Sequence, residues 1–290
     1  MQHTHLQLNV QQTMGAAKIR EDVIAAFSLR PTTIVFDEAV AVTHEAIRAG
    51  AKARGYEVLI PTGAASQVVL AWDASVYELV SSKVTFAMKG KEHVSPNRYV
   101  VRAKLRDTLT GQLVVLVGTH MVSSGWTGSK SLDAWRQAGW FAHEAIMAAI
   151  LLAAYLANEV VIWSGDLNRP PSTFSGTVLP KFRIAGAATS EIVETDGTHG
   201  RTIFDYVGIL SRKLKVTVAH WSTPDFNSDH DGVLVEATWP DPAPKPTPPP
   251  IRPATASEDI EAWIAAYYPA PQAGWLKPRL DELRAIAKKH

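Results

Sequence analysis

The sequence predicts an α+β fold in which two mainly antiparallel β-sheets pack together and are flanked by helices. Some ten short apolar runs are bounded by Gly, Pro, Asp or Asn, and many are rich in Val, Ile and Thr, which is typical of strands. Only three stretches have the pattern expected of helices. So many strands with so few helices fit neither a TIM barrel nor a simple doubly wound sheet.

The expected elements follow one another along the first 236 residues. The predicted strands are Thr4–Val10, Thr32–Asp37, Tyr56–Ile60, Ser66–Ala71, Lys83–Met88, Tyr99–Leu105, Leu113–Thr119, Val160–Ser164, Ile203–Leu210, Val216–Ala219 and Gly232–Glu236. The predicted helices are Ala16–Ser28, Thr43–Arg54 and Leu132–Ala157. The longest apolar run, 145–157, is shorter than the ~20 residues that cross a bilayer, so we expect a buried helix and no membrane span. No secretory signal is recognised at the N-terminus, which makes a cytoplasmic location the default expectation.

A proline-rich stretch predicts a domain boundary near residue 240. Residues 240–253 hold 8 of the 18 prolines of the chain, and proline excludes both helix and central strand. We therefore predict a folded body at 1–239, an extended linker at 240–256 and a short helical segment at 257–290. That segment is too short for a core of its own. It could pack on the body, bind a protein partner or stay partly disordered, and its aromatic residues favour packing.

Composition narrows the chemistry that the chain can perform. The chain has no cysteine, which excludes a disulfide scaffold, a thiolate zinc site, an iron–sulfur cluster and a cysteine nucleophile. Any metal must therefore be held by oxygen or imidazole ligands. With 29 Lys and Arg against 28 Asp and Glu, the chain lacks the strong positive charge typical of non-enzymatic nucleic-acid binders.

Polar side chains follow or interrupt the apolar strands at six places. These places are Asn9, Asp37-Glu38, His120, Asp166 with Asn168, Asp205 and Ser228-Asp229-His230. One such residue alone is usually a turn residue, although Asp205 lies within an apolar run and must find a partner there. Together they supply the carboxylates that Mg²⁺ prefers and the imidazoles that transfer protons. The set is complete for metal-assisted attack on a phosphate ester.

In this order the residues resemble those of the endonuclease/exonuclease/phosphatase superfamily, the DNase I-like metal-dependent phosphoesterases. The resemblance covers about residues 4–238, and the strand–turn–strand segment 71–80 is also similar to that of the family. Its most specific part is Gly165-Asp166-Leu167-Asn168 together with Ser228-Asp229-His230, about 60 residues further on. The resemblance implies the DNase I-like four-layer sandwich, here with a short helical appendage at the C-terminus.

The resemblance also implies a metal site. Glu38 would be the main Mg²⁺ ligand, supported by Asn9 and Asp229, and Mn²⁺ or Ca²⁺ could take the place of Mg²⁺. Asp166 would orient or activate the attacking water, or would hold metal as in some members. The residue before the metal-binding glutamate is commonly Gln in this family, but here it is Asp37. This extra carboxylate could tighten metal binding or repel a phosphate.

Further residues would contact the phosphate. Asn168 would donate to a phosphate oxygen, and His230, oriented by Asp205, would contact the scissile phosphate. His120 would be a second imidazole, placed for phosphate contact or for protonation of the leaving group. Arg98, which opens the strand before His120, matches a phosphate-contacting arginine only loosely.

Three hypotheses follow for the function. The first is an Mg²⁺-dependent nuclease that hydrolyses DNA phosphodiester bonds by in-line attack of water. The second keeps this chemistry but assigns a lipid, inositol or nucleotide phosphate as substrate, and the neutral body favours it because duplex binders usually carry excess basic charge. The third is a non-catalytic binding module that acts through the C-terminal segment. The completeness of the polar set argues against this last hypothesis.

Overall fold

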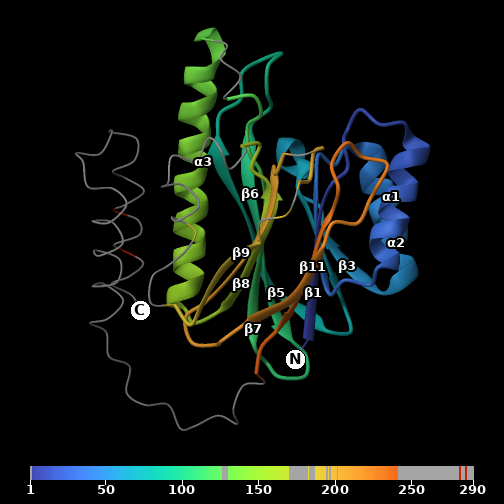
Figure 1. Ribbon diagram of the computed structural model, residues 1–290, viewed down its shortest axis with the longest axis vertical. Coiled ribbons are helices and arrows are strands. Elements are labelled where there is room, and N and C mark those ends of the chain that lie inside the picture. Colours follow the sequence, from blue (N-terminus) through green and yellow to red (C-terminus); the bar gives the residue numbers. More distant parts are fainter. Residues whose placement is uncertain are drawn as a thin grey trace.

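The fold has four layers, with the two sheets stacked face to face and helices on both outer faces (Figure 1). The computed structural model describes residues 2–125, 130–169, 182, 187–193, 195, 197–200, 202–240, 281 and 285, without the side chains of 130–132. The predicted two-sheet α+β fold, mainly antiparallel, is confirmed. The linker and the C-terminal segment lie outside the described residues apart from 240, 281 and 285, so the division into domains stays a prediction.

The first sheet has the strand order β11-β12-β1-β2-β4-β3. Its strands are β1 (Gln2–Asn9), β2 (Thr33–Asp37), β3 (Tyr56–Leu59), β4 (Val69–Asp73), β11 (Thr217–Ser222) and β12 (Val233–Thr238). Strands β1 and β2 run parallel, and the other neighbouring pairs are antiparallel. The parallel pair therefore delivers two carboxyl ends to the same edge of the sheet.

The second sheet repeats this arrangement with the order β5-β6-β7-β8-β10-β9. Its strands are β5 (Tyr77–Met88), β6 (Arg98–Asp107), β7 (Leu113–His120), β8 (Val160–Asp166), β9 (Thr189–Val193) and β10 (Asp205–Ser211). Here β7 and β8 form the parallel pair, and the other pairs are antiparallel. Each sheet thus has one parallel pair at its centre.

The helices bury the outer faces of the sheets. Helices α1 (Ala16–Ser28) and α2 (Ala41–Arg54) cover the first sheet, and α3 (Lys130–Leu156) covers the second (Figure 1). A short 3₁₀ helix, η1 (Gly63–Gln67), precedes β4. By length and composition, 133–156 of α3 could span a membrane. However, 61% of the 18-residue apolar window within this range is buried inside the structure. The predicted burial of this helix is confirmed, since its apolar residues pack on the second sheet.

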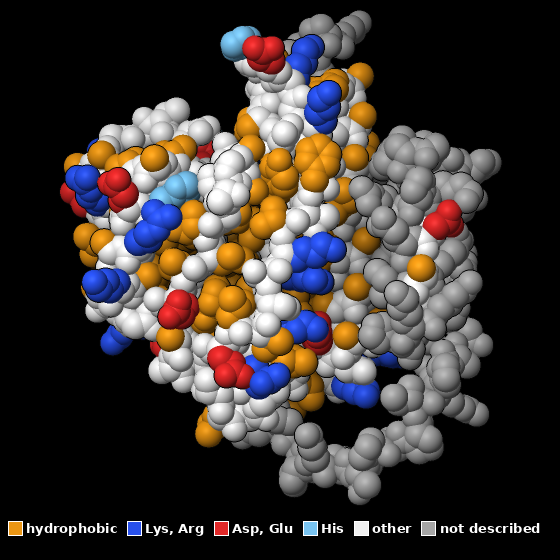
Figure 2. Space-filling view, turned by 180° about the vertical axis from the view of Figure 1, so that it is seen from behind, with side chains coloured by type: hydrophobic (Ala, Val, Ile, Leu, Met, Phe, Trp, Pro, Cys, Tyr) orange, Lys and Arg blue, Asp and Glu red, His pale blue; other side chains and the backbone are white. Residues whose placement is uncertain are grey.

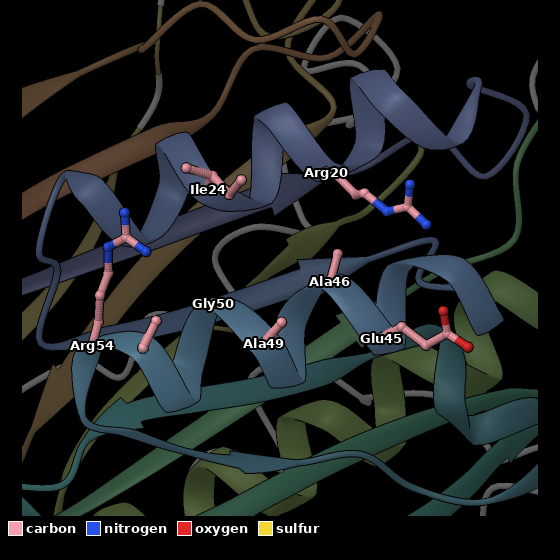
Figure 3. Close-up of a pocket in the computed structure, with 8 residues that line it drawn as sticks. Arg20, Ile24, Glu45, Ala46, Ala49, Gly50 and Arg54 are labelled. Atoms are coloured by element: carbon pink, nitrogen blue, oxygen red, sulfur yellow. The ribbon is translucent and has the colours of Figure 1, made fainter.

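Helices α1 and α2 pack closely because Gly50 has no side chain. A Cβ added there would lie 2.7 Å from the ring of Phe27. The small residues of α2 leave a groove between the two helices, with charged side chains at both of its ends (Figure 3). This groove contains none of the residues that the sequence predicts for the functional site.

The observed elements differ from the predicted ones mainly at sheet edges. Strand β9 was not predicted, because this edge strand lacks a long apolar run. The edge strand β5 begins six residues before its predicted start, because 78–84 are exposed and show no burial alternation. Four of the exposed large hydrophobic residues lie on this strand, namely Leu79, Val80, Val84 and Phe86. The space-filling view shows hydrophobic side chains interspersed with Lys and Arg on one face of the molecule (Figure 2).

The layer between the sheets contains a buried polar cluster beside its apolar core. Thr33 contacts Nε2 of His3 at 3.1 Å and Nδ1 of His5 at 2.8 Å, and Nε2 of His5 lies 2.9 Å from Oγ of Ser164 on the second sheet. Nδ1 of His3 lies 2.9 Å from the hydroxyl of Tyr77. Burial lowers the pKa of both histidines, that of His3 to about 3. Both imidazoles are therefore neutral members of the core.

We expect His3 to make folding sensitive to acid. Between pH 6.5 and about 3 the unfolded chain binds a proton at His3 that the folded chain does not bind, so stability is full above pH 6.5 and falls below it. Within this pH range, the unfolding free energy falls by about 1.4 kcal/mol for each unit by which the pH is lowered. His3→Gln abolishes this contribution, so its difference in unfolding free energy from wild type, measured in urea, should shrink as the pH falls from 7.5 to 4.5. A difference that does not change with pH would contradict the prediction.

Candidate active site

The C-terminal ends of four central strands meet at one end of the stacked sheets. Asn9 ends β1 and Glu38 follows β2, while His120 ends β7 and Asp166 ends β8. The two parallel pairs bring these ends together, and the amide of Asn9 donates to Oδ2 of Asp166 across the sheets at 3.1 Å. Side chains predicted from four separate segments therefore form one cluster.

Glu38, His120 and Asp166 form the centre of this cluster. Nε2 of His120 lies 3.7 Å from Oε1 of Glu38 and 3.8 Å from Oδ2 of Asp166, and one ligand atom from each residue lies within 4.8 Å of the others. Glu38 adopts a left-handed φ of 55°, and its Oε2 accepts the backbone amide of Gln12 at 3.2 Å. Its side chain is 21% exposed, whereas the other two are almost fully buried. Solvent can therefore reach the cluster on the side of Glu38.

The end of β8 is shaped by Gly165. Its φ is 153°, and a Cβ at this position would overlap the carbonyl oxygen of Thr119 on β7. The close approach holds Asp166 beside His120, its register partner. Oδ1 of Asp166 accepts the backbone amide of Asn168 at 2.6 Å, and the Asn168 side-chain amide donates to the carbonyl of Met121 at 3.2 Å. The predicted phosphate contact of Asn168 stays a prediction.

Arg98 lies against His120. Its guanidinium donates to Nδ1 of His120 at 2.9 Å and to Oε1 of Gln67 at 3.2 Å. Because Arg only donates, Nδ1 must carry the lone pair, and Nε2 carries the hydrogen that points toward Glu38 and Asp166. Burial and the charge of Arg98 lower the pKa of His120 well below its usual value. The structure thus gives Arg98 a positioning role, while its direct phosphate contact stays a prediction.

His230 lies beside a carboxylate, whereas His120 lies beside a guanidinium. Its Nδ1 lies 2.6 Å from Oδ2 of Asp205, which is fully buried at the start of β10. Burial lowers the pKa of His230, but the hydrogen bond and charge of Asp205 outweigh it and raise the pKa to about 10. Asp205 and Asp166 face each other in register, so this charged imidazole lies next to the Glu38 cluster. The structure thus brings Asp205 and His230 together, while the predicted contact of His230 with the scissile phosphate stays a prediction.

Two buried residues connect these groups, namely Gln7, which was not predicted for the site, and Asp37, which was predicted to act beside Glu38. The amide of Gln7 donates to Oδ2 of Asp37 at 3.2 Å and to Oδ1 of Asp205 at 2.8 Å, and Oδ2 of Asp37 accepts the backbone amide of Asp166 at 2.8 Å. Asp37 is therefore an interior residue and does not line the site beside Glu38. Period-two alternation along β1, which places Gln7 on the same face as Asn9, was the available signal for Gln7.

Asp229 lies beside two histidines. Its ligand atoms group with those of His199 and His230 and not with those of Glu38, so its predicted support of the Glu38 metal site stays a prediction. His199 was also missed. It lies in a short loop before β10, and its ring centroid is 4.8 Å from that of His230. No strand pattern marks it in the sequence.

The donor set at Glu38 fits a divalent cation. Burial and the neighbouring charge of Asp205 raise the pKa of Asp166 well above its usual value, and burial with the charges of Asp166 and Asp205 does the same for Asp37. Several carboxyl groups are thus crowded in a poorly solvated place, which a cation would relieve. The carboxylates of Glu38 and Asp166 are the hard ligands that Mg²⁺ prefers. The amide oxygen of Asn9 accepts the backbone amide of Gln11 at 3.0 Å, so its predicted support of the metal site stays a prediction.

Comparison with known proteins agrees with this fold. The sequence matches no protein-family model and no curated protein sequence. Solved structures are similar at 14–15% identity. They include a humanised D. rerio TDP2 (TM-score 0.61, 82% of this chain and 99% of that chain), an endonuclease/exonuclease/phosphatase from Bacteroides vulgatus (0.59, 83% and 100%) and the human Nocturnin catalytic domain with bound sulfate (0.60, 82% and 95%). The chain therefore has the DNase I-like fold of the endonuclease/exonuclease/phosphatase superfamily, and the predicted resemblance is confirmed at the level of the fold.

We expect Gly165→Ala to destabilise the protein strongly. The new methyl group would overlap the backbone of Thr119 in addition to straining φ, so we expect a loss of about 3 kcal/mol or more in unfolding free energy. Gly111→Ala is the matched control, because its φ is 73° but the space around it is open, and it should cost only about 1 kcal/mol. Urea unfolding measures both, and equal losses would contradict the packing argument.

The pKa of His230 should depend on Asp205. In wild type the ring should stay protonated through neutral pH, with a pKa of about 10. Asp205→Asn removes the charge but leaves the burial, so the pKa should fall by about 2. Histidine ring signals followed by NMR across pH 5–11 measure this, with His230→Gln to assign the signal. An unchanged titration in Asp205→Asn would show that Asp205 does not set the charge of His230.

Proposed function

We propose that the protein is a divalent-metal-dependent phosphoesterase. The observation that supports this proposal is the meeting of the Glu38–His120–Asp166 cluster with the Asp205–His230 pair at one edge of the sheets. One group supplies oxygen ligands for a cation, and the other supplies a charged imidazole. Both groups would assist ester hydrolysis at phosphorus, because negative charge must be neutralised while a water molecule attacks.

Each side chain has a role that follows from its surroundings. Glu38 and Asp166, with Asn9, would hold Mg²⁺, which neutralises phosphate oxygens and polarises the ester when bound. His230, kept protonated by Asp205, would donate to a phosphate oxygen. His120 is neutral, and its Nε2 hydrogen is available to the phosphate or the leaving oxygen. Asp166, at the junction of both groups, is placed to orient water.

We favour DNA as the substrate, hydrolysed by in-line attack of water. A loop beside the site, 89–97, carries exposed Lys89 and Lys91 and lines a groove. The loop is tied to the site through Ser95, whose Oγ lies 3.4 Å from the guanidinium of Arg98. A DNA strand bound with its scissile phosphate in the site would extend toward these basic residues. Among similar folds, D. rerio TDP2 has been solved with a single-strand DNA product.

A small phosphate ester is the second candidate substrate. The net charge of +1 is low for a DNA-binding enzyme. Similar folds also include a mannosyl-6-phosphatase from Bacteroides thetaiotaomicron and ANGEL2, a 2′,3′-cyclic phosphatase. The two candidates differ in salt dependence, because contacts to several DNA phosphates weaken steeply as salt rises.

Glu38→Gln should reduce metal-dependent hydrolysis by about 100-fold or more, since it removes a charged ligand without changing shape. The substrates are plasmid DNA, single-stranded DNA, bis-p-nitrophenyl phosphate and p-nitrophenyl phosphate, each assayed with a chelator, Mg²⁺, Mn²⁺ or Ca²⁺. Glu78→Gln is the matched control, because Glu78 is exposed on β5 and pairs with Arg106. It should retain the wild-type rate.

Two outcomes would contradict the proposal. One is the absence of hydrolysis on every substrate with every cation. The other is hydrolysis that neither Glu38→Gln nor His230→Gln reduces. Preference for DNA is tested separately, by repeating the assay at rising salt. A rate on DNA that is insensitive to salt, with faster turnover of p-nitrophenyl phosphate, would favour the small-ester candidate.

A further inference from the structure

A second group of potential metal ligands lies at the mouth of the site. His199, Asp229 and His230 each offer one ligand atom, and these atoms lie within 4.8 Å of one another. The side chains of His199 and Asp229 are 43% and 44% exposed, whereas His230 is nearly buried. The group therefore has a solvent side through which an ion can enter.

Both imidazoles are oriented through Nδ1. Nδ1 of His230 donates to the carboxylate of Asp205 at 2.6 Å, and Nδ1 of His199 donates to the backbone carbonyl of Asp229 at 2.8 Å. Neither Nε2 has a hydrogen-bond partner within the described part of the chain. Histidines that bind metal commonly donate their other ring nitrogen to a carboxylate or a backbone carbonyl, which fixes the ring and its tautomer. Both histidines show this arrangement.

The two loops that carry the ligands are linked by backbone hydrogen bonds. The amide of Asp231 donates to the carbonyl of Thr198 at 2.7 Å. The loop of His199 is closed by mutual bonds between His199 and Thr202, at 2.9 and 3.1 Å. These bonds hold the two loops against each other, so the backbone that carries the three side chains is fixed without an ion.

We propose that His199, Asp229 and His230 form a site for a zinc-class transition-metal ion, separate from the cation site at Glu38. Two imidazoles and one carboxylate, with the remaining positions open to water, suit Zn²⁺. Mg²⁺ prefers oxygen ligands and is expected at Glu38 instead. Binding releases the Nε2 proton of His230 to solvent as the nitrogen coordinates the ion.

Occupation of this site would block His230. Nε2 is the nitrogen of His230 that remains to contact a phosphate, so a bound zinc-class ion would remove that contact. This consequence rests on the proposed function, whereas the binding site does not. Zinc should therefore inhibit hydrolysis in the presence of excess Mg²⁺.

Cobalt titration of the chelator-treated full chain tests the site directly, because Co²⁺ with imidazole ligands absorbs visible light. In excess Mg²⁺ we expect about one equivalent of Co²⁺, displaced by Zn²⁺, in wild type and in Glu38→Gln. His199→Ala and Asp229→Ala should each weaken the affinity for Co²⁺ by about 100-fold. The matched control is His93→Ala, since His93 is exposed on the loop at 89–97. Circular dichroism and the unfolding midpoint confirm that each variant is folded.

The site is overturned if His199→Ala and Asp229→Ala bind cobalt as wild type does, or if the signal is lost in Glu38→Gln and not in them. An inhibition assay adds a second readout. The zinc concentration that halves the rate, relative to the zinc-free rate of the same variant, should rise at least tenfold in His199→Ala. If the protein hydrolyses no phosphate ester, the cobalt titration still decides whether the site exists. If hydrolysis is confirmed but cobalt does not bind, only the second site fails.

Discussion

The geometry of the candidate site depends on the buried side-chain amide of Gln7, which joins the two sheets. It donates to Asp37 on the first sheet and to Asp205 on the second. Through these partners it connects to the backbone of Asp166 and to the ring of His230. Buried carboxyl groups without donors cost several kcal/mol, so sheets that slipped past each other would lose stability. The hydrogen bonds of Gln7 therefore constrain both the packing of the two sheets and the alignment of the site.

This constraint is part of a wider feature of β1. Alternate residues of the strand, His3, His5, Gln7 and Asn9, point toward the second sheet, where each finds a polar partner. Leu6 and Leu8 point the other way and pack under α1 and α2. An apolar interface tolerates small shifts, whereas hydrogen bonds require particular partners. A central strand with one polar and one apolar face thus lets the same segment support the core and fix the register of the sheets.

The sequence predicted which segments carry the polar residues, because an apolar strand ending in acid, amide or imidazole is a local pattern. It could not predict which adjacent residues have side chains that point in different directions. Asp37 and Glu38 are adjacent, yet one is buried between the sheets and the other reaches the cluster with His120. Asp229 is exposed and His230 is nearly buried, and His199 joins them only through the tertiary fold. Side-chain direction at strand ends and in loops depends on backbone angles and long-range contacts that a single sequence does not contain.

The two central histidines show why burial is needed for the site to work. In water both imidazoles would titrate near pH 6.5. Within the fold, burial and then the charge of Arg98 lower the pKa of His120 and keep it neutral, whereas the hydrogen bond and charge of Asp205 outweigh burial and keep His230 charged. A neutral imidazole can lie between Glu38 and Asp166 without repelling the cation that their carboxylates would attract. A charged imidazole further out would complement the phosphate of the proposed substrate without competing for the same position. Arg98 and Asp205 thus divide the two imidazoles into a neutral donor and a cationic one, a division that suits the proposed phosphoester chemistry better than simple metal storage.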